Sequence, residues 1–303
     1  MQKASNAGRG IFLMLLAVMI FAVQDAISRY LAETYNVWFV MMIRFHVMFV
    51  AVILLALRRG PDFRSAIRSG MPKLQLFRSL LLVTQTCLIV TCFTKIGLIN
   101  THAIFASAPL IGAALSVPIL GEKVGWRRWL AIAVGFIGVL IILQPGADSF
   151  SLMSLLVLIS ACMFATYGVV TRLVSRTDSS AVSLFWAGIV GGIFMTPFGL
   201  ANIVPIAVAD WPWMAILCVT GMGAHLLMIM ALEAAEPSIV QPFAYTQLVF
   251  VSFIGVVVFN EELKTSVLMG TPIVIGAGLF TIWRTAVKAR AEKRAALLQA
   301  GGR

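Results

Sequence analysis

The sequence predicts an all-α integral membrane protein whose ten transmembrane helices form two inverted five-helix repeats. Of its 303 residues, 60% are hydrophobic and 12% are charged, and no connecting segment is long enough for a soluble domain. Ten apolar stretches each approach the ~20 residues that a helix needs to cross a bilayer. We expect spans at residues 11–31, 37–57, 74–94, 99–120, 126–144, 152–173, 181–200, 213–233, 238–259 and 266–285.

The first apolar stretch is expected to be a retained helix and not a cleaved secretory signal. Lys3 and Arg9 precede it, as basic residues precede the apolar part of a signal peptide. However, the stretch runs too long and ends in Gln24, Asp25 and Arg29 without a small-residue cleavage site. We therefore count it as span one.

The net charge of +11 is explained by membrane topology. Most Lys and Arg residues lie at the amino terminus, at span ends, in the loops after spans two, four and six, or after span ten. Short loops rich in Lys and Arg stay cytoplasmic, whereas the loops after spans five and seven contain neither residue. We expect both termini to be cytoplasmic, the basic residues to contact anionic lipid, and nucleic acid not to be a partner.

The cysteines indicate no metal site. Cys87, Cys92, Cys162 and Cys218 all lie inside predicted spans, without the Cys-x-x-Cys or Cys/His spacing of a zinc or redox centre. We expect them to be small core side chains, and we expect no metal and no cofactor.

Small residues and prolines indicate how some spans pack. Spans five and ten are rich in Gly and Ala and almost free of polar groups, which predicts close helix packing within each half or between protomers. Pro109 lies in the middle of span four, where it is a candidate for a kink at a cavity.

Short motifs recur in the two halves of the chain. Phe21-Ala22 and Ser28-Arg29 in span one match Phe164-Ala165 and Thr171-Arg172 in span six, at an offset of 143 residues. Residues 117–122 match residues 256–261 at an offset of 139. Because five spans per half is an odd number, the second copy must enter the membrane upside down. We expect repeats at residues 1–145 and 146–303, the second ending in a basic cytoplasmic tail.

These features resemble the EamA-type branch of the drug/metabolite transporter superfamily. The resemblance rests on the five-plus-five spans, on the Phe-Ala pairs, and on Gly121-Glu122-Lys-Val closing span four, echoed by Asn260-Glu261-Glu-Leu closing span nine. It implies a carrier of small metabolites in the bacterial inner (plasma) membrane, often an exporter, with its cavity between the halves. Asn260 replaces the glycine of the motif. Independently, Glu122 and Glu261 precede the next span, where a carboxylate can cap the start of that helix.

Asp25 and Arg44 are the leading candidates for substrate binding. Both are expected to lie ~10 Å below the periplasmic boundary, Asp25 on span one and Arg44 on span two, so that they can pair. A zwitterionic substrate would place its ammonium group on Asp25 and its carboxylate on Arg44, whose planar fork suits a carboxylate. A permanent ion pair that locks the two spans together explains the residues equally well.

The remaining candidates come from both halves. His225 aligns with Thr86 and lies beside Gln85 in the inverted repeat, which predicts a shared cavity. Gln241 and Tyr245 are four residues apart and would share a helix face. A packing role is open for each of these side chains. The further substrate-binding candidates are Gln24, Gln85, Tyr167, Trp186, His225, Gln241 and Tyr245, within a wider polar set that also holds His46, His102 and Gln247.

The function predicted is secondary transport by alternating access, not enzymatic catalysis, because no His-Glu-x-x-His or Gly-x-Ser-x-Gly motif is present. The first hypothesis is a small polar or zwitterionic, amino-acid-like substrate that is exported. The alternative is uptake or exchange of a cationic or nucleoside-like metabolite, such as an adenosyl sulfonium compound that stacks on Trp186, Tyr167 or Tyr245. Proton coupling through Asp25 or His225 and proton-free exchange both remain open, as do a monomer and a homodimer.

Overall fold

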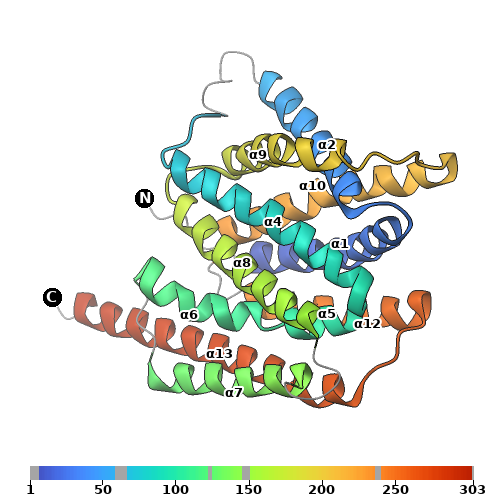
Figure 1. Ribbon diagram of the computed structural model, residues 1–303. Helices are drawn as coiled ribbons and strands as arrows, with labels where there is room; N and C mark the ends of the chain where they lie inside the picture. The colour runs from blue at the N-terminus through green and yellow to red at the C-terminus, as the bar shows by residue number, and fades with distance from the viewer. Residues whose placement is uncertain (1–6, 59–66, 122–124, 145–150, 236–239, 302–303) are drawn as a thin grey trace.

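The computed structural model describes residues 7–58, 67–121, 125–144, 151–235 and 240–301 (Figure 1). This part of the chain contains seven helices long and apolar enough to cross a membrane and three shorter apolar ones, and no strand. In chain order the elements are α1 (Ala7–Thr34), α2 (Val37–Leu57), α4 (Pro72–Ile96), α5 (Leu98–Phe105), α6 (Ala108–Leu120), α7 (Trp126–Leu143), α8 (Leu152–Val174), α9 (Ser180–Leu200), η2 (Val208–Asp210), α10 (Trp211–Ala234), η3 (Gln241–Tyr245), α12 (Thr246–Phe259) and α13 (Thr265–Gly301).

A helix or a pair of helices occupies each stretch that the sequence predicted as a span, but two of them are broken. In the fourth stretch α5 ends at Phe105 and α6 begins at Ala108, one residue before Pro109. The ninth stretch begins as the 3-10 helix η3, with Pro242 in its first turn, and continues as α12. Proline has no N–H to donate, so each break lies where the helical ladder loses a donor.

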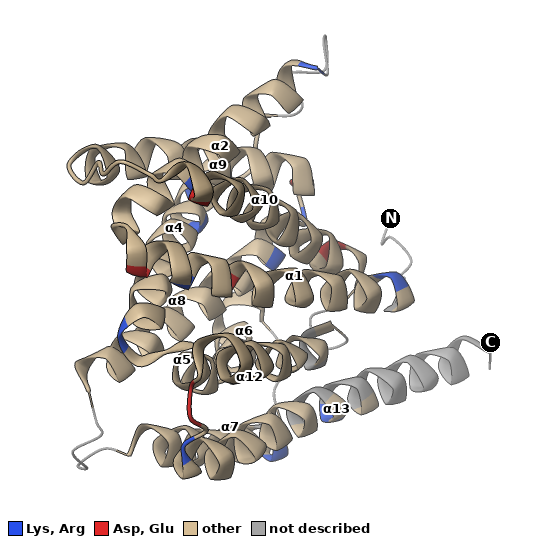
Figure 2. Cartoon of the chain, turned by 90° about the vertical axis from the view of Figure 1, so that its right-hand side faces the viewer, with Lys and Arg blue, Asp and Glu red and all other residues tan. Residues whose placement is uncertain are grey.

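The helices pack in pairs that join distant parts of the chain. α1 packs against α10 and α12, while α8 packs against α4 and α6. α2 packs against α9. α7 packs against α13, and these two helices lie side by side at one edge of the bundle in Figure 1. Most of the helical surface carries no charged residue (Figure 2).

The α7–α13 pair corrects one expectation. Small residues do bring two backbones together, because a Cβ added to Gly138 would lie 2.9 Å from the Gly270 oxygen, and one added to Gly270 would lie 2.6 Å from the Gly138 oxygen. The contact joins predicted span five to predicted span ten, so it crosses between the halves and does not lie within one half.

Buried carboxylates tie loops to helix starts at both ends of the bundle. At one end, Asp210 accepts hydrogen bonds from Tyr30 (2.9 Å) and Tyr35 (2.6 Å), and the bond to Asp210 raises the pKa of Tyr35 above its ordinary value. At the other end, Asp178 accepts bonds from the backbone N–H of Gly70 and the amide of Gln75, both 2.8 Å long. Burial alone would raise the pKa of Asp178, but these hydrogen bonds lower it overall.

Glu261 caps a helix, but not the one expected. Its carboxylate accepts the backbone N–H groups of Leu98 (2.7 Å) and Ile99 (2.8 Å) at the start of α5, and it pairs with Arg29 of α1. The next helix in the chain, α13, begins only at Thr265. The cap therefore joins three distant segments. Glu122, the corresponding residue of the first half, lies outside the described residues.

Candidate functional site

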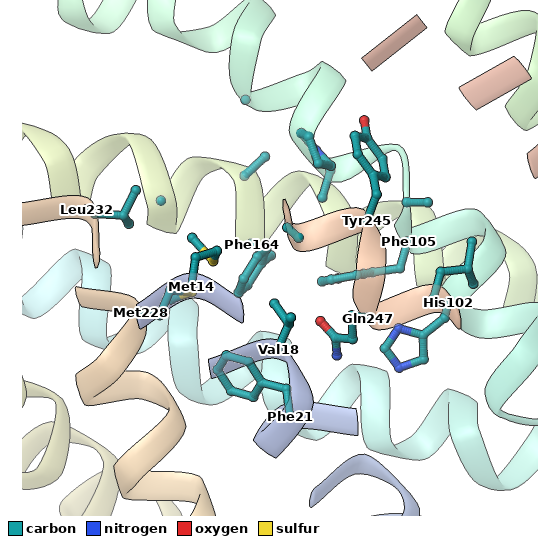
Figure 3. Close-up of a pocket in the computed structure, with 18 residues that line it drawn as sticks. Met14, Val18, Phe21, His102, Phe105, Phe164, Met228, Leu232, Tyr245 and Gln247 are labelled. Carbon is teal, nitrogen blue, oxygen red and sulfur yellow. The ribbon is translucent and has the colours of Figure 1, made fainter. Parts of the chain in front are cut away.

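A largely apolar chamber lies inside the bundle between α1, α5, α6, α8, α10 and α12 (Figure 3). Its empty space, open mouth included, is about 910 Å³. Met14, Met228 and Leu232 lie at the end of the chamber opposite Gln247 and His102 (Figure 3). The aromatic rings that line it belong to Phe21, Phe105, Phe164 and Tyr245.

The chamber follows from local sequence features. The break between α5 and α6 brings Phe105 against Phe164 of α8, with ring centroids 5.2 Å apart. Phe21 and Phe164 are the two phenylalanines of the repeated Phe-Ala motif. Gly168 leaves open space, because a Cβ added there would meet no atom within 4 Å. Aromatic walls and small residues therefore surround the same volume.

A polar chamber of about 470 Å³ adjoins the apolar one and shares Phe21, His102, Phe105, Phe164 and Gln247 with it. Its other polar side chains come from α1, α2, α4 and α10. Five of the nine sequence-predicted site residues meet here, which are Gln24, Asp25, Arg44, Gln85 and His225.

The carboxylate of Asp25 is held by α5 and α12, which corrects the expected partner. Gln247 donates a 3.0 Å hydrogen bond to Oδ2 of Asp25, and Nε2 of His102 lies 3.2 Å from the same oxygen. The geometry of this approach is not that of a hydrogen bond, so Nε2 of His102 has no hydrogen-bond partner among the described residues. Asp25 and Arg44 line the same chamber, but they form no ion pair among the interactions of the described residues. The permanent lock between the first two predicted spans is therefore absent.

Arg44 is a buried cation without a buried anion in contact. The residue is 5% exposed, and its guanidinium donates a long hydrogen bond of 4.0 Å to the sulfur of Met41, a weak acceptor. Gln24, on the same chamber wall, has a buried Oε1 without a hydrogen-bond partner. Buried polar groups are nearly always satisfied, and a thioether sulfur is a weak acceptor. The weakly bonded Arg44 guanidinium and the unpartnered Gln24 oxygen of the described chain therefore indicate a ligand that supplies partners for both.

His225 and Gln85 both line the polar chamber. The Nδ1 atom of His225 lies 3.0 Å from the carbonyl oxygen of Gly221, and because a carbonyl oxygen can only accept, this nitrogen is the donor. The imidazole ring packs edge-on against Phe21, with centroids 4.9 Å apart. Gln85 and Thr86 reach the chamber from α4.

Three of the other predicted site residues lie elsewhere. The fully buried Tyr167 accepts a 3.2 Å hydrogen bond from Arg78, and Trp186 donates a 3.1 Å bond to the Ile67 oxygen; neither lines the two chambers. Tyr245 lines the apolar chamber, but its hydroxyl points away from Gln247 and His102 (Figure 3). The side chain of Gln241 lies outside the described residues.

Sequence reasoning missed Arg78 and Phe105. Arg78 is fully buried and donates hydrogen bonds to Gln75 (3.1 Å), Tyr167 (3.2 Å) and the Ser183 oxygen (2.5 Å), which ties α4 to α8 and α9. A lone arginine inside a predicted span is itself a signal, because a charge within the membrane needs partners. Phe105 carries no such signal, since apolar residues surround it in the sequence.

Comparison with known proteins shows similarity to membrane carriers. The sequence model of the EamA-like transporter family matches residues 8–144 and 151–283. The chain is 24% identical over 274 residues to an S-adenosylmethionine uptake transporter of Rickettsia prowazekii (strain Madrid E), covering 90% of this chain and 92% of that protein. It is 28% identical over 305 residues to a riboflavin transporter of Vibrio cholerae serotype O1 (strain ATCC 39315 / El Tor Inaba N16961), covering 95% and 97%. A solved crystal structure shares the fold, with a TM-score of 0.66 at 12% identity over 91% of this chain and 98% of that one.

Proposed function

The chain belongs to the EamA-like transporter family, and on this premise we propose that it is a secondary transporter for uptake of a metabolite with a fused heteroaromatic ring and an amino-acid end. S-adenosylmethionine is the leading candidate. The observation that carries the proposal is the two-part cavity, in which an aromatic chamber adjoins a polar chamber that holds the weakly hydrogen-bonded cation of Arg44 and the unpartnered acceptor Oε1 of Gln24.

The polar chamber suits the amino-acid end of this substrate. The guanidinium of Arg44 takes the carboxylate, whose geometry it matches with two parallel hydrogen bonds. The ammonium group of the substrate donates to the Oε1 atom of Gln24 and to the carboxylate of Asp25, which are neighbours on α1. Binding would thus give the Arg44 guanidinium and the Gln24 oxygen strong hydrogen-bond partners.

The aromatic chamber suits the rest of the molecule. Adenine stacks between phenylalanine rings, and a sulfonium cation is attracted to the faces of such rings. Phe21, Phe105 and Phe164 border both chambers, so they stand where the sulfur would lie between the two ends of the substrate. They replace Tyr167 and Trp186 in this role.

The uptake transporters for S-adenosylmethionine among the relatives favour uptake of a nucleoside-like metabolite over the amino-acid-like export that the sequence placed first. A riboflavin-like substrate is the second candidate, because similar proteins carry that name and the aromatic chamber also suits a flavin ring. Riboflavin is uncharged. It would therefore depend on the phenylalanines and much less on Asp25.

We further propose ten transmembrane spans in two inverted halves, at residues 1–145 and 146–303, that alternate access in the inner membrane with both termini in the cytoplasm. In this arrangement α1 corresponds to α8, α4 to α10, and α6 to α12. The contact of α1 with α10 then corresponds to the contact of α8 with α4, and the contact of α1 with α12 corresponds to the contact of α8 with α6. The fourth helix of each half is broken near its proline. Discontinuous helices at a repeat interface are typical of substrate sites in transporters.

Counterflow into proteoliposomes tests the substrate and the role of Asp25 together. The wild-type protein should show saturable S-adenosylmethionine counterflow. Asp25→Asn should reduce it about tenfold or more, because a hydrogen bond to a charged group contributes about 1.5–3 kcal/mol. Glu33→Gln, at a partly exposed carboxylate on the same helix that lines neither chamber, is the matched control and should retain full flux.

The outcomes separate the alternatives. The flavin substrate would be favoured by two results together: the wild type carries riboflavin but not S-adenosylmethionine, and Asp25→Asn leaves the riboflavin flux intact. Flux of neither compound would refute both assignments. Full S-adenosylmethionine flux in Asp25→Asn would remove this carboxylate from the binding site.

A further inference from the structure

We propose that Gly221 of α10 determines specificity for a carboxylated substrate, because its missing side chain lets the guanidinium of Arg44 lie across α10 at the edge of the polar chamber. This inference rests on the proposed function, in which Arg44 receives the substrate carboxylate. It adds a positioning residue that touches no substrate itself.

The geometry around Gly221 carries the inference. A Cβ atom added to Gly221 would lie 2.6 Å from Nε, 3.1 Å from Cζ and 3.2 Å from Nη2 of Arg44. Real Cβ atoms essentially never approach a heavy atom to 2.6 Å, so an alanine and the present position of the guanidinium exclude each other. The nearest atoms that such a Cβ would meet all belong to Arg44.

Backbone conformation does not explain this glycine. Gly221 lies inside α10 with no positive φ, and glycine in a helix interior is about 1 kcal/mol less favourable than alanine. Glycine at this position therefore lowers the stability of the helix relative to alanine, and in return it leaves space for the guanidinium of Arg44. One turn later, His225 bonds to the carbonyl oxygen of Gly221, so the peptide that supports Arg44 also orients the imidazole.

The guanidinium of Arg44 is the far end of a flexible side chain, so it can shift away from an added Cβ without unfolding the bundle. It also lines a small cavity together with Gly221 and His225. We expect Gly221→Ala to push the guanidinium out of its place at the polar chamber while the fold is retained. The variant should then lose recognition of the carboxylate alone.

The same helix offers a matched control. A Cβ added to Gly223 meets nothing within 4 Å, so Gly223→Ala makes the same gain in helix propensity without a clash. The ligands are S-adenosylmethionine and decarboxylated S-adenosylmethionine, which differ only in the carboxylate. Affinity of the purified, full-length protein for each compound is measured by ligand-dependent thermal shift and by equilibrium binding.

Wild-type protein and Gly223→Ala should prefer S-adenosylmethionine over the decarboxylated compound by about tenfold or more. Gly221→Ala and Arg44→Ala should both abolish this preference and leave affinity for the decarboxylated compound unchanged. Because the two changes act through one contact, the double variant should show no further loss. A merely structural role of Gly221 would instead weaken both ligands equally.

Other outcomes overturn the inference. If Gly221→Ala keeps the preference, or lowers affinity for both compounds alike, Gly221 does not position Arg44. If Gly221→Ala does not fold, Arg44→Ala in the same chain removes the clashing atoms and should restore folding; continued failure locates the clash elsewhere and refutes the proposal. Wild-type protein that binds neither compound refutes the proposed S-adenosylmethionine function and this inference with it, whereas failure in the variants alone refutes only the inference.

Discussion

The junction around Glu261 should be a main determinant of stability. The change Glu261→Gln keeps the shape of the side chain and removes its charge. The carboxylate now accepts two backbone N–H groups, from Leu98 at 2.7 Å and Ile99 at 2.8 Å, and also pairs with Arg29. The NH₂ group of a glutamine cannot accept, so one backbone donor at the start of α5 would lose its partner.

The size of the effect follows from burial. The side chains of Arg29 and Glu261 are 14% and 11% exposed, so the pair is largely shielded from water. A hydrogen bond to a charged group contributes about 1.5–3 kcal/mol, and removing one partner of a buried pair costs about 3–5 kcal/mol. Because the junction retains some solvent contact, we expect Glu261→Gln to lower the free energy of unfolding by about 2–4 kcal/mol.

Glu33→Gln is the matched control. Glu33 also bonds to Arg29, at 2.7 Å and one helical turn away, but its side chain is 39% exposed. An exposed pair at this spacing is worth about 0.3–0.5 kcal/mol. Equilibrium chemical denaturation in detergent micelles measures both variants. Equal losses from Glu261→Gln and Glu33→Gln, or a loss below about 0.5 kcal/mol from Glu261→Gln, would show that the cap of α5 does not stabilise the bundle in this way.

Two further changes test the fold. Gly97 has a φ of +83°, and a Cβ there would lie 2.7 Å from the Glu261 carboxylate, whereas Gly121 has a φ of +73° with no atom within 4 Å. Gly97→Ala should therefore destabilise the protein more than Gly121→Ala in the same denaturation assay. Alanine at position 97 meets the carboxylate and also takes a ψ of 168° that L residues rarely adopt at positive φ, whereas Gly121 lies in the left-handed helical region. The pKa of Asp178 is lowered on folding, so its carboxylate contributes stability that is fully present above its unfolded pKa of about 4 and is lost as the pH falls from there through its lower folded pKa. Asp178→Asn should be clearly less stable than wild type at pH 7, and this difference should shrink steadily as the pH falls below about 4. A pH-independent difference would contradict the linkage.

Several parts of the site could be predicted because they depend on one residue at a time. A polar residue inside an apolar stretch is visible without a structure, and this singled out Gln24, Asp25, Arg44, Gln85 and His225, which meet in one chamber. The same reasoning placed Pro109 at a break, because the lack of a backbone donor is a property of the residue. Whether these groups bind substrate remains a prediction.

Partners could not be predicted in the same way. Depth in the membrane follows from counting residues, but the direction in which a side chain points depends on how each helix is rotated against its neighbours. Asp25 and Arg44 have matching depths, yet Asp25 is held by Gln247 and approached by His102. Tyr167 and Trp186 are deep in their spans but face Arg78 and the Ile67 carbonyl.

The sequence by itself determined that the chain is a helical membrane protein with polar groups at defined depths, because hydrophobic length and composition act locally along the chain. Only the tertiary structure decided that Glu261 caps α5, that α7 packs on α13, and that the guanidinium of Arg44 rests on Gly221. These contacts join residues more than 100 positions apart. They depend on the packing of whole helices, which no local pattern in the sequence encodes.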